Sequence, residues 1–152
     1  MSIMIRSLAN SVLLQHWDGY LPVDAQRMAS ALGIEIEGCG DVEHSGHYAN
    51  GKIVFNTRQP LQQQRFSIAH QIGHHLAGDT LCPEESAQTF STAARSAKEI
   101  QANNFALAVL IPGEHLRYAV LRANECDLKQ LALHFGVSTV ALQKRLQQIQ
   151  LL

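Results

Sequence analysis

The sequence has no long hydrophobic run, few cysteines and no excess of charge of either sign. No segment approaches the roughly 18 consecutive apolar residues that a membrane-spanning helix needs, and the residues up to Asp18 lack the pattern of a secretory signal peptide. The cysteines Cys39, Cys82 and Cys126 are odd in number and widely scattered, which fits neither a disulfide framework nor a paired-cysteine zinc site. We therefore expect a soluble, cytoplasmic protein.

Charge and length narrow the class of protein further. Twelve Lys and Arg residues against 13 Asp and Glu residues give a formal net charge of -1. This balance supplies no strongly basic surface to neutralise phosphates, so we expect no direct contact with nucleic acid. A chain of 152 residues with 46% hydrophobic content can form one domain with a real core and is too short for two comfortable ones. We expect a single domain over residues 1–152.

Hydrophobic periodicity and the positions of Gly and Pro predict an α+β fold that is mostly helical, with a small β-sheet. A helix is expected to run from Pro60 to the residue before Gly78, because no proline interrupts it and glycine is typical just past a helix end. The other predicted segments are helices at 8–17 and 23–32, strands at 34–37 and 52–55, one or two helices within 84–110, and two short helices within 127–149.

Two histidines in the predicted helix have the spacing of metal ligands. His70 and His74 lie four residues apart and so project from one face, where both imidazoles can reach a single ion. Zinc suits this pair, and a catalytic zinc needs a third protein ligand and an open position for water. We assign that third position to Glu99, on a later helix. Gly73 between the histidines would let another element approach closely, while Ile68, Ile72 and Leu76 form the core-facing stripe.

The residues around these histidines resemble the zinc helix of the ImmA/IrrE family of metallopeptidases. The resemblance rests on segments 65–76 (RFSIAHQIGHHL), 99–106 (EIQANNFA), 110–112 (LIP), 135–138 (FGVS) and 145–146 (RL). It spans most of the chain. It implies a zincin-like fold, Zn²⁺ bound by His70, His74 and Glu99, and a role in cleaving or controlling a repressor or antitoxin protein of the helix-turn-helix type, encoded nearby.

Gln71 departs from the HEXXH pattern of such peptidases, in which a glutamate follows the first histidine. That glutamate takes a proton from the metal-bound water and later delivers one to the leaving amine. An amide cannot do this, although it has nearly the same shape and still forms hydrogen bonds. We expect metal binding to persist and proton transfer to be lost. Gln71 is either an engineered replacement, which we favour, or the natural residue of a peptidase-derived binding module.

Four further residues are weaker candidates for the site. Asp79, just beyond the helix end, and Asn103, one turn after Glu99, are candidates to orient the metal ligands by hydrogen bonds. His47 and Tyr48 lie in a polar stretch from which a hydrogen-bond donor could reach the transition state, although a solvated loop is the simpler interpretation.

The segment 127–150 resembles a helix-turn-helix, with a turn at Gly136 and an N-cap at Ser138. Lys144 and Arg145 are its only cations after Lys129, too few for a convincing phosphate footprint. We expect the segment to pack on the peptidase or to contact a partner. Two alternative functions stay open: a DNA-binding regulator that uses this segment, and a non-catalytic binding module or toxin in which zinc is a structural pin.

Overall fold

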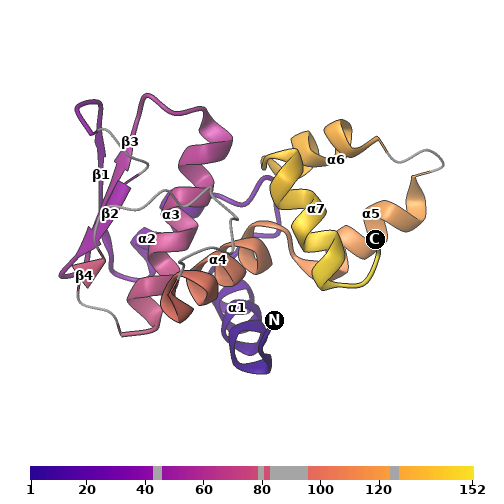
Figure 1. The fold of residues 1–152 in the computed structure, drawn as a ribbon, viewed down its shortest axis with the longest axis horizontal. Helices are drawn as coiled ribbons and strands as arrows, with labels where there is room; N and C mark the ends of the chain where they lie inside the picture. Colours follow the sequence, from indigo (N-terminus) through magenta and orange to yellow (C-terminus); the bar gives the residue numbers. More distant parts are fainter. Residues whose placement is uncertain (43–45, 79–80, 83–95, 124–126) are drawn as a thin grey trace.

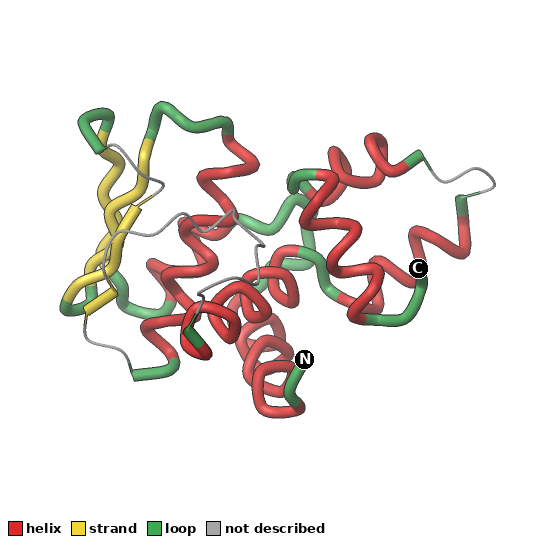
Figure 2. Tube along the Cα trace, in the orientation of Figure 1, coloured by secondary structure: helices red, strands yellow, loops and turns green. Residues whose placement is uncertain are grey.

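The computed structural model contains seven helices and four strands in the part of the chain that it describes, residues 1–42, 46–78, 81–82, 96–123 and 127–152. Figure 2 shows the strands gathered at one end and helices forming the rest. In chain order the elements are α1 (Ile3–His16), α2 (Ala25–Ala31), β1 (Glu35–Cys39), β2 (Gly46–Ala49), β3 (Lys52–Asn56), α3 (Leu61–Leu76), β4 (Leu81–Cys82), α4 (Ala97–Leu110), α5 (Gly113–Arg122), α6 (Leu128–Phe135) and α7 (Thr139–Gln148). The expected α+β class is confirmed.

The sheet has the strand order β1-β3-β2-β4, with β1 parallel to β3 and β2 antiparallel to both β3 and β4. The two predicted strands correspond to β1 and β3. The expectation of a solvated loop between them was wrong, because that stretch contains β2. Gly46 at the start of β2 explains the error: a Cβ there would collide with the carbonyl oxygen of Val54, so the strand pairing requires the residue that marks a turn in sequence.

Helix α3 lies in the middle of the molecule, against β2 and β3 on one side and against α4 on another (Figure 1). Every residue from Phe66 to His74 is therefore buried, including the polar ones. Ile68 and Ile72 face the core as predicted, whereas Leu76 is only half-buried. Polar side chains in a helix segment that is buried on all sides are stable only if they have partners. The two buried histidines therefore indicate a polar or metal-binding site.

Two helices depart from the sequence-based expectations. Helix α1 begins at Ile3, earlier than predicted, because the Ser2 hydroxyl accepts a hydrogen bond from the Ile5 amide at 3.2 Å and caps the helix. Helix α5, which begins directly after Pro112, was not anticipated. The expected helical stretch before Pro112 contains α4, capped by Ser96, and its earlier residues lie outside the described part of the chain.

Helices α6 and α7 form the expected C-terminal pair. Gly136 ends α6 at φ +67°, a left-handed conformation that glycine adopts without strain, and the Ser138 hydroxyl caps α7. The pair packs on the rest of the protein through α7, which contacts α4. The buried Arg145 donates from Nε to the Ile111 carbonyl oxygen at 2.9 Å. Among the described residues, no helix is long and apolar enough to cross a membrane.

Candidate metal centre

Helices α3 and α4 approach closely at Gly73, as the sequence predicted. A Cβ at Gly73 would lie 3.1 Å from the Cα of Ala102 and 3.3 Å from the Cβ of Phe105. The first is a backbone atom of α4 and the second is bonded directly to that backbone, so neither can move aside as the end of a flexible side chain would. The glycine therefore sets the distance between the two helices that carry the candidate ligands.

Replacing Gly73 by alanine should lower the free energy of unfolding by about 1 kcal/mol. The methyl group forces overpacking that typically costs about 1–3 kcal/mol, partly offset by up to about 1 kcal/mol of improved helix propensity. Urea denaturation of the metal-free protein measures this difference. Gly113→Ala is the matched control, because its methyl would meet only the end of the Arg145 side chain and an Ile149 methyl at 3.3 and 3.9 Å. Equal stability of both variants would contradict the close-approach argument.

His70, His74 and Glu99 converge at this crossing. The Nε2 atoms of the two histidines are 3.1 Å apart. The Glu99 carboxylate meets both rings, with Oε2 2.9 Å from His70 Nε2 and Oε1 2.8 Å from His74 Nε2. All three residues are at least 95% buried, and their ligand atoms lie within 4.8 Å of one another. The structure thus contains a buried His-His-Glu group that can hold a metal ion.

The hydrogen bonding of His70 fits this use. Its Nδ1 lies 2.7 Å from Asn103 Oδ1. An amide oxygen can only accept, so Nδ1 carries the proton and the neutral ring presents a lone pair at Nε2. Burial lowers the pKa of His70 below its usual value, although Glu99 acts in the opposite direction, and the ring is therefore neutral near pH 7. A lone pair facing the Glu99 carboxylate inside a protein favours a cation between them.

Removing the Asn103 side chain should lower metal affinity about 10–100-fold, the usual effect of losing a hydrogen bond that orients a ligating histidine. Asn103→Asp keeps an acceptor for the Nδ1 proton and should retain most of the affinity. Asn104→Ala is the matched control, because Asn104 Oδ1 instead accepts a hydrogen bond from Gln148 of α7 at 2.8 Å. Competition with a chromogenic chelator measures the affinities. A purely structural role predicts equal losses for Asn103→Ala and Asn103→Asp.

Gln71, at the predicted general-base position, is 1% exposed. Its Oε1 is buried and has no hydrogen-bond partner among the described residues. A buried amide oxygen without a partner is costly, by about 1–3 kcal/mol. The described part of the fold thus leaves room at this oxygen for a partner from outside the chain, such as a water molecule or a bound ligand.

The remaining candidate residues lie in less direct positions. Tyr48 is a buried residue of β2 rather than part of a solvated loop, so that interpretation was wrong. Its hydroxyl lies 2.7 Å from His75 Nδ1 and accepts from the Gly51 amide at 3.1 Å. His47 is half-buried in the same strand. Asp79 lies outside the described residues.

Sequence reasoning missed the contact between Tyr48 and His75. The partner of His75 lies on a separate strand, which the spacing of residues along the sequence does not indicate. The two rings form an edge-to-face pair with centroids 5.6 Å apart, which ties β2 to the end of α3 beside His74. This contact fixes the helix end that carries the second histidine.

Comparisons with known proteins agree with this geometry. A family model described as the IrrE N-terminal-like domain, peptidase M78, matches residues 31–147. A Mycobacterium tuberculosis transcriptional regulator of known structure superposes with a TM-score of 0.68 at 21% identity, over 95% of this chain and 46% of that protein. The chain thus spans less than half of that protein, and the similarity shows the fold alone. No curated protein has a significant sequence match. The chain belongs to the IrrE N-terminal-like domain family of M78 peptidases, as the ImmA/IrrE resemblance indicated, and has its mostly helical, zincin-like fold.

Proposed function

We propose that this chain is a zinc metallopeptidase domain, spanning residues 1–152, in which Gln71 blocks hydrolysis. The observation that carries the proposal is the buried group formed by His70, His74 and Glu99. The two Nε2 atoms are 3.1 Å apart, and a different carboxylate oxygen of Glu99 faces each of them at 2.8–2.9 Å, near the roughly 3.3 Å edge expected for ligands about 2.0–2.1 Å from a tetrahedral zinc. Two imidazoles and one carboxylate also form a known catalytic zinc set.

Under this proposal, each residue of the site has a separate role in peptide hydrolysis. Zinc held by these ligands would supply a Lewis acid and an acidic bound water. Asn103 fixes the orientation of His70, and the negative charge of Glu99 offsets the cation in a buried position. The residue at position 71 has to accept a proton, and the amide of Gln71 cannot. With glutamine at position 71, the protein would therefore still bind metal and substrate but would not hydrolyse the substrate.

The substrate class that we propose is a helix-turn-helix repressor or antitoxin encoded nearby, acting in the cytoplasm. Membership of the IrrE N-terminal-like family supports a regulatory peptidase. The structural similarity to a transcriptional regulator is compatible with this role. Under this proposal the protein acts on gene expression through another protein rather than through DNA.

The test uses the Gln71 protein and its Gln71→Glu variant, each incubated with the neighbouring repressor while intact mass is followed. Metal analysis of both proteins runs in parallel. Equimolar zinc in both, with repressor cleavage by the glutamate variant only, supports the proposal. Absence of zinc from both proteins, loaded under non-chelating conditions, refutes the metal centre.

The second candidate is a non-catalytic binding module or toxin with zinc as a structural pin, and Gln71 itself favours it. Equimolar zinc and a stable complex with the repressor, without cleavage by either protein, would select this candidate. The DNA-binding alternative is weakened by Arg145, a cation of the C-terminal pair that is buried and bonded to the Ile111 carbonyl. Salt-sensitive operator binding by the purified protein would restore it.

A further inference from the structure

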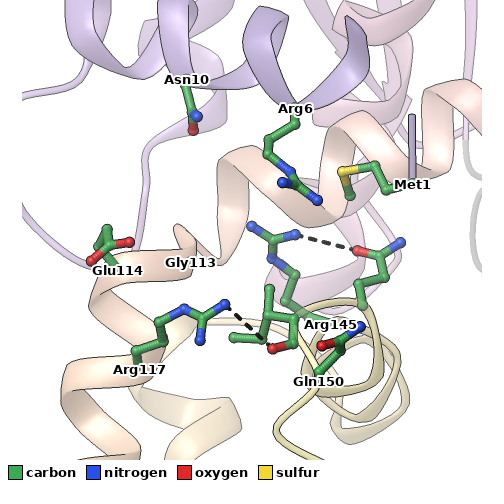
Figure 3. Close-up of a pocket in the computed structure, with 10 residues that line it drawn as sticks. Met1, Arg6, Asn10, Gly113, Glu114, Arg117, Arg145 and Gln150 are labelled. Carbon is green, nitrogen blue, oxygen red and sulfur yellow. Dashed lines mark hydrogen bonds between the residues drawn. The ribbon is translucent and has the colours of Figure 1, made fainter. Parts of the chain in front are cut away.

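A polar cavity whose lining includes none of the candidate metal ligands lies between α1, α5 and the end of α7 (Figure 3). It has a volume of about 430 Å³. One arginine from each helix lines it: Arg6 from α1, Arg117 from α5 and Arg145 from α7. In Figure 3 the side chain of Arg6 extends from its helix toward the guanidinium of Arg145. Arg6 and Arg145 are more than a hundred positions apart in the sequence. No sequence pattern therefore indicates that the three arginines lie together.

The cavity has an excess of positive charge, with three arginines and one glutamate among its lining residues. Among the described residues, no carboxylate oxygen lies within 4.0 Å of the three guanidinium groups. Among the residues that the structure describes, Glu114 is the one acidic residue that lines the cavity. Burial, and then the charges of Arg6 and Arg117, lower the pKa of Arg145 to about 10, so Arg145 stays charged at neutral pH. Holding like charges together in a partly buried site costs free energy that a bound anion would recover.

Arg145 is fixed in place at the base of the cavity. It is 7% exposed and donates from Nε to the Ile111 carbonyl oxygen at 2.9 Å and from Nη1 to Gln148 Oε1 at 3.4 Å. Its Nη2 lies beside Gly113, at the first residue of α5, where a Cβ would come within 3.3 Å. A rigid guanidinium next to the amino end of a ten-residue helix is a preorganised anion binder. Arg6 and Arg117 are exposed at the rim, where Arg117 Nη2 also donates to the Ile149 carbonyl oxygen at 3.4 Å.

We propose that this cavity, lined by Arg6, Arg117 and Arg145, binds the phosphate group of a small soluble molecule. Guanidinium groups match phosphate oxygens by paired hydrogen bonds, and the cavity volume falls in the range of small-molecule sites, roughly 300–1,000 Å³. The volume exceeds that of a phosphate ion, so it leaves room for an organic group of about nucleotide size. The burial of Arg145 disfavours the backbone of a DNA duplex, which would reach only the rim.

Binding at this place would join the C-terminal helices to the body of the protein. The three arginines belong to three separate helices, and α1 also packs on α4, the helix that carries Glu99. A ligand bound by all three would hold α7 in its docked position and raise the stability of the protein. The inference does not depend on the proposed peptidase function, because the metal-free protein should bind equally well.

The test is isothermal titration of the full chain, with chelator present, using inorganic phosphate, pyrophosphate and adenosine monophosphate at constant ionic strength. We expect saturable binding of adenosine monophosphate, weakened about tenfold or more by either Arg6→Gln or Arg117→Gln. Arg122→Gln is the matched control: this residue is on α5 but stacks over Tyr118, with its guanidinium 4.9 Å from the ring centroid, and does not line the cavity. Circular dichroism checks that each variant is folded.

Three results would overturn the proposal. The first is no saturable binding of any of the three probes. The second is equal weakening by Arg122→Gln and by the cavity variants, which would indicate general charge attraction. The third is retention of duplex DNA that depends on Arg6 and Arg117 while the small phosphates fail to bind, which would assign the arginines to a nucleic-acid contact. Binding of inorganic phosphate as tightly as the nucleotide would keep the phosphate site and identify the free ion as its ligand.

Discussion

Replacing Gln71 by glutamate should raise peptide hydrolysis by about 10²–10⁴-fold, the contribution typical of a positioned general base. The residue is buried one position after His70 on the metal-binding helix, and glutamate has nearly the same volume as glutamine. The substitution therefore adds a proton acceptor with little change in packing. The initial rate of repressor cleavage, followed by intact mass, measures the gain.

Two controls separate proton transfer from other effects of this substitution. Gln71→Ala removes the side chain without adding a base and should leave the rate at the level of the unmodified protein. Glu99→Ala combined with Gln71→Glu should abolish the gain, because the carboxylate at position 71 would have no metal-bound water to act on. If Gln71→Glu binds zinc and the repressor as well as the unmodified protein does and still cleaves no faster, the peptidase assignment fails.

The part of the site that lies within helix α3 was predictable from the sequence. His70 and His74 are related by helical periodicity alone, and Gly73 was expected to admit a neighbour. That the neighbour is α4, at Ala102 and Phe105, required the structure. The position of Glu99 opposite both histidines likewise depends on how α4 crosses α3, which no local pattern encodes.

The features that sequence reasoning missed are those created by tertiary contacts. Strand β2 is short and begins at a glycine, so its composition favours a loop. Its pairing with β3 nevertheless makes it a strand. Helix α5 follows directly on Pro112, a residue type that in sequence also marks the end of a preceding helix, and Leu116 is its one buried residue. The arginine-lined cavity combines side chains from the two ends of the chain. Each of these features depends on contacts between segments that are far apart in the sequence.

Removing the metal should lower the melting temperature by roughly 10 °C, corresponding to about 4 kcal/mol when free zinc exceeds its dissociation constant a thousandfold. The physical reason is that the metal binds the folded protein, and its removal leaves a buried carboxylate without the cation that offsets its charge. Glu99 is 5% exposed, so water cannot take the place of the cation at low cost. Calorimetry with zinc and with a chelator in excess measures the shift.

Glu99→Ala should make the melting temperature insensitive to zinc, because two histidines alone bind the ion weakly. The metal-free form of this variant should be at least as stable as the metal-free unmodified protein, since the substitution removes a buried charge. Glu114→Ala is the matched control: each glutamate lies in the first turn of its helix, but Glu114 lines the arginine cavity and should leave the zinc response unchanged. A zinc response retained in Glu99→Ala and lost in Glu114→Ala would place the metal at the wrong end of the molecule for peptide hydrolysis by this site.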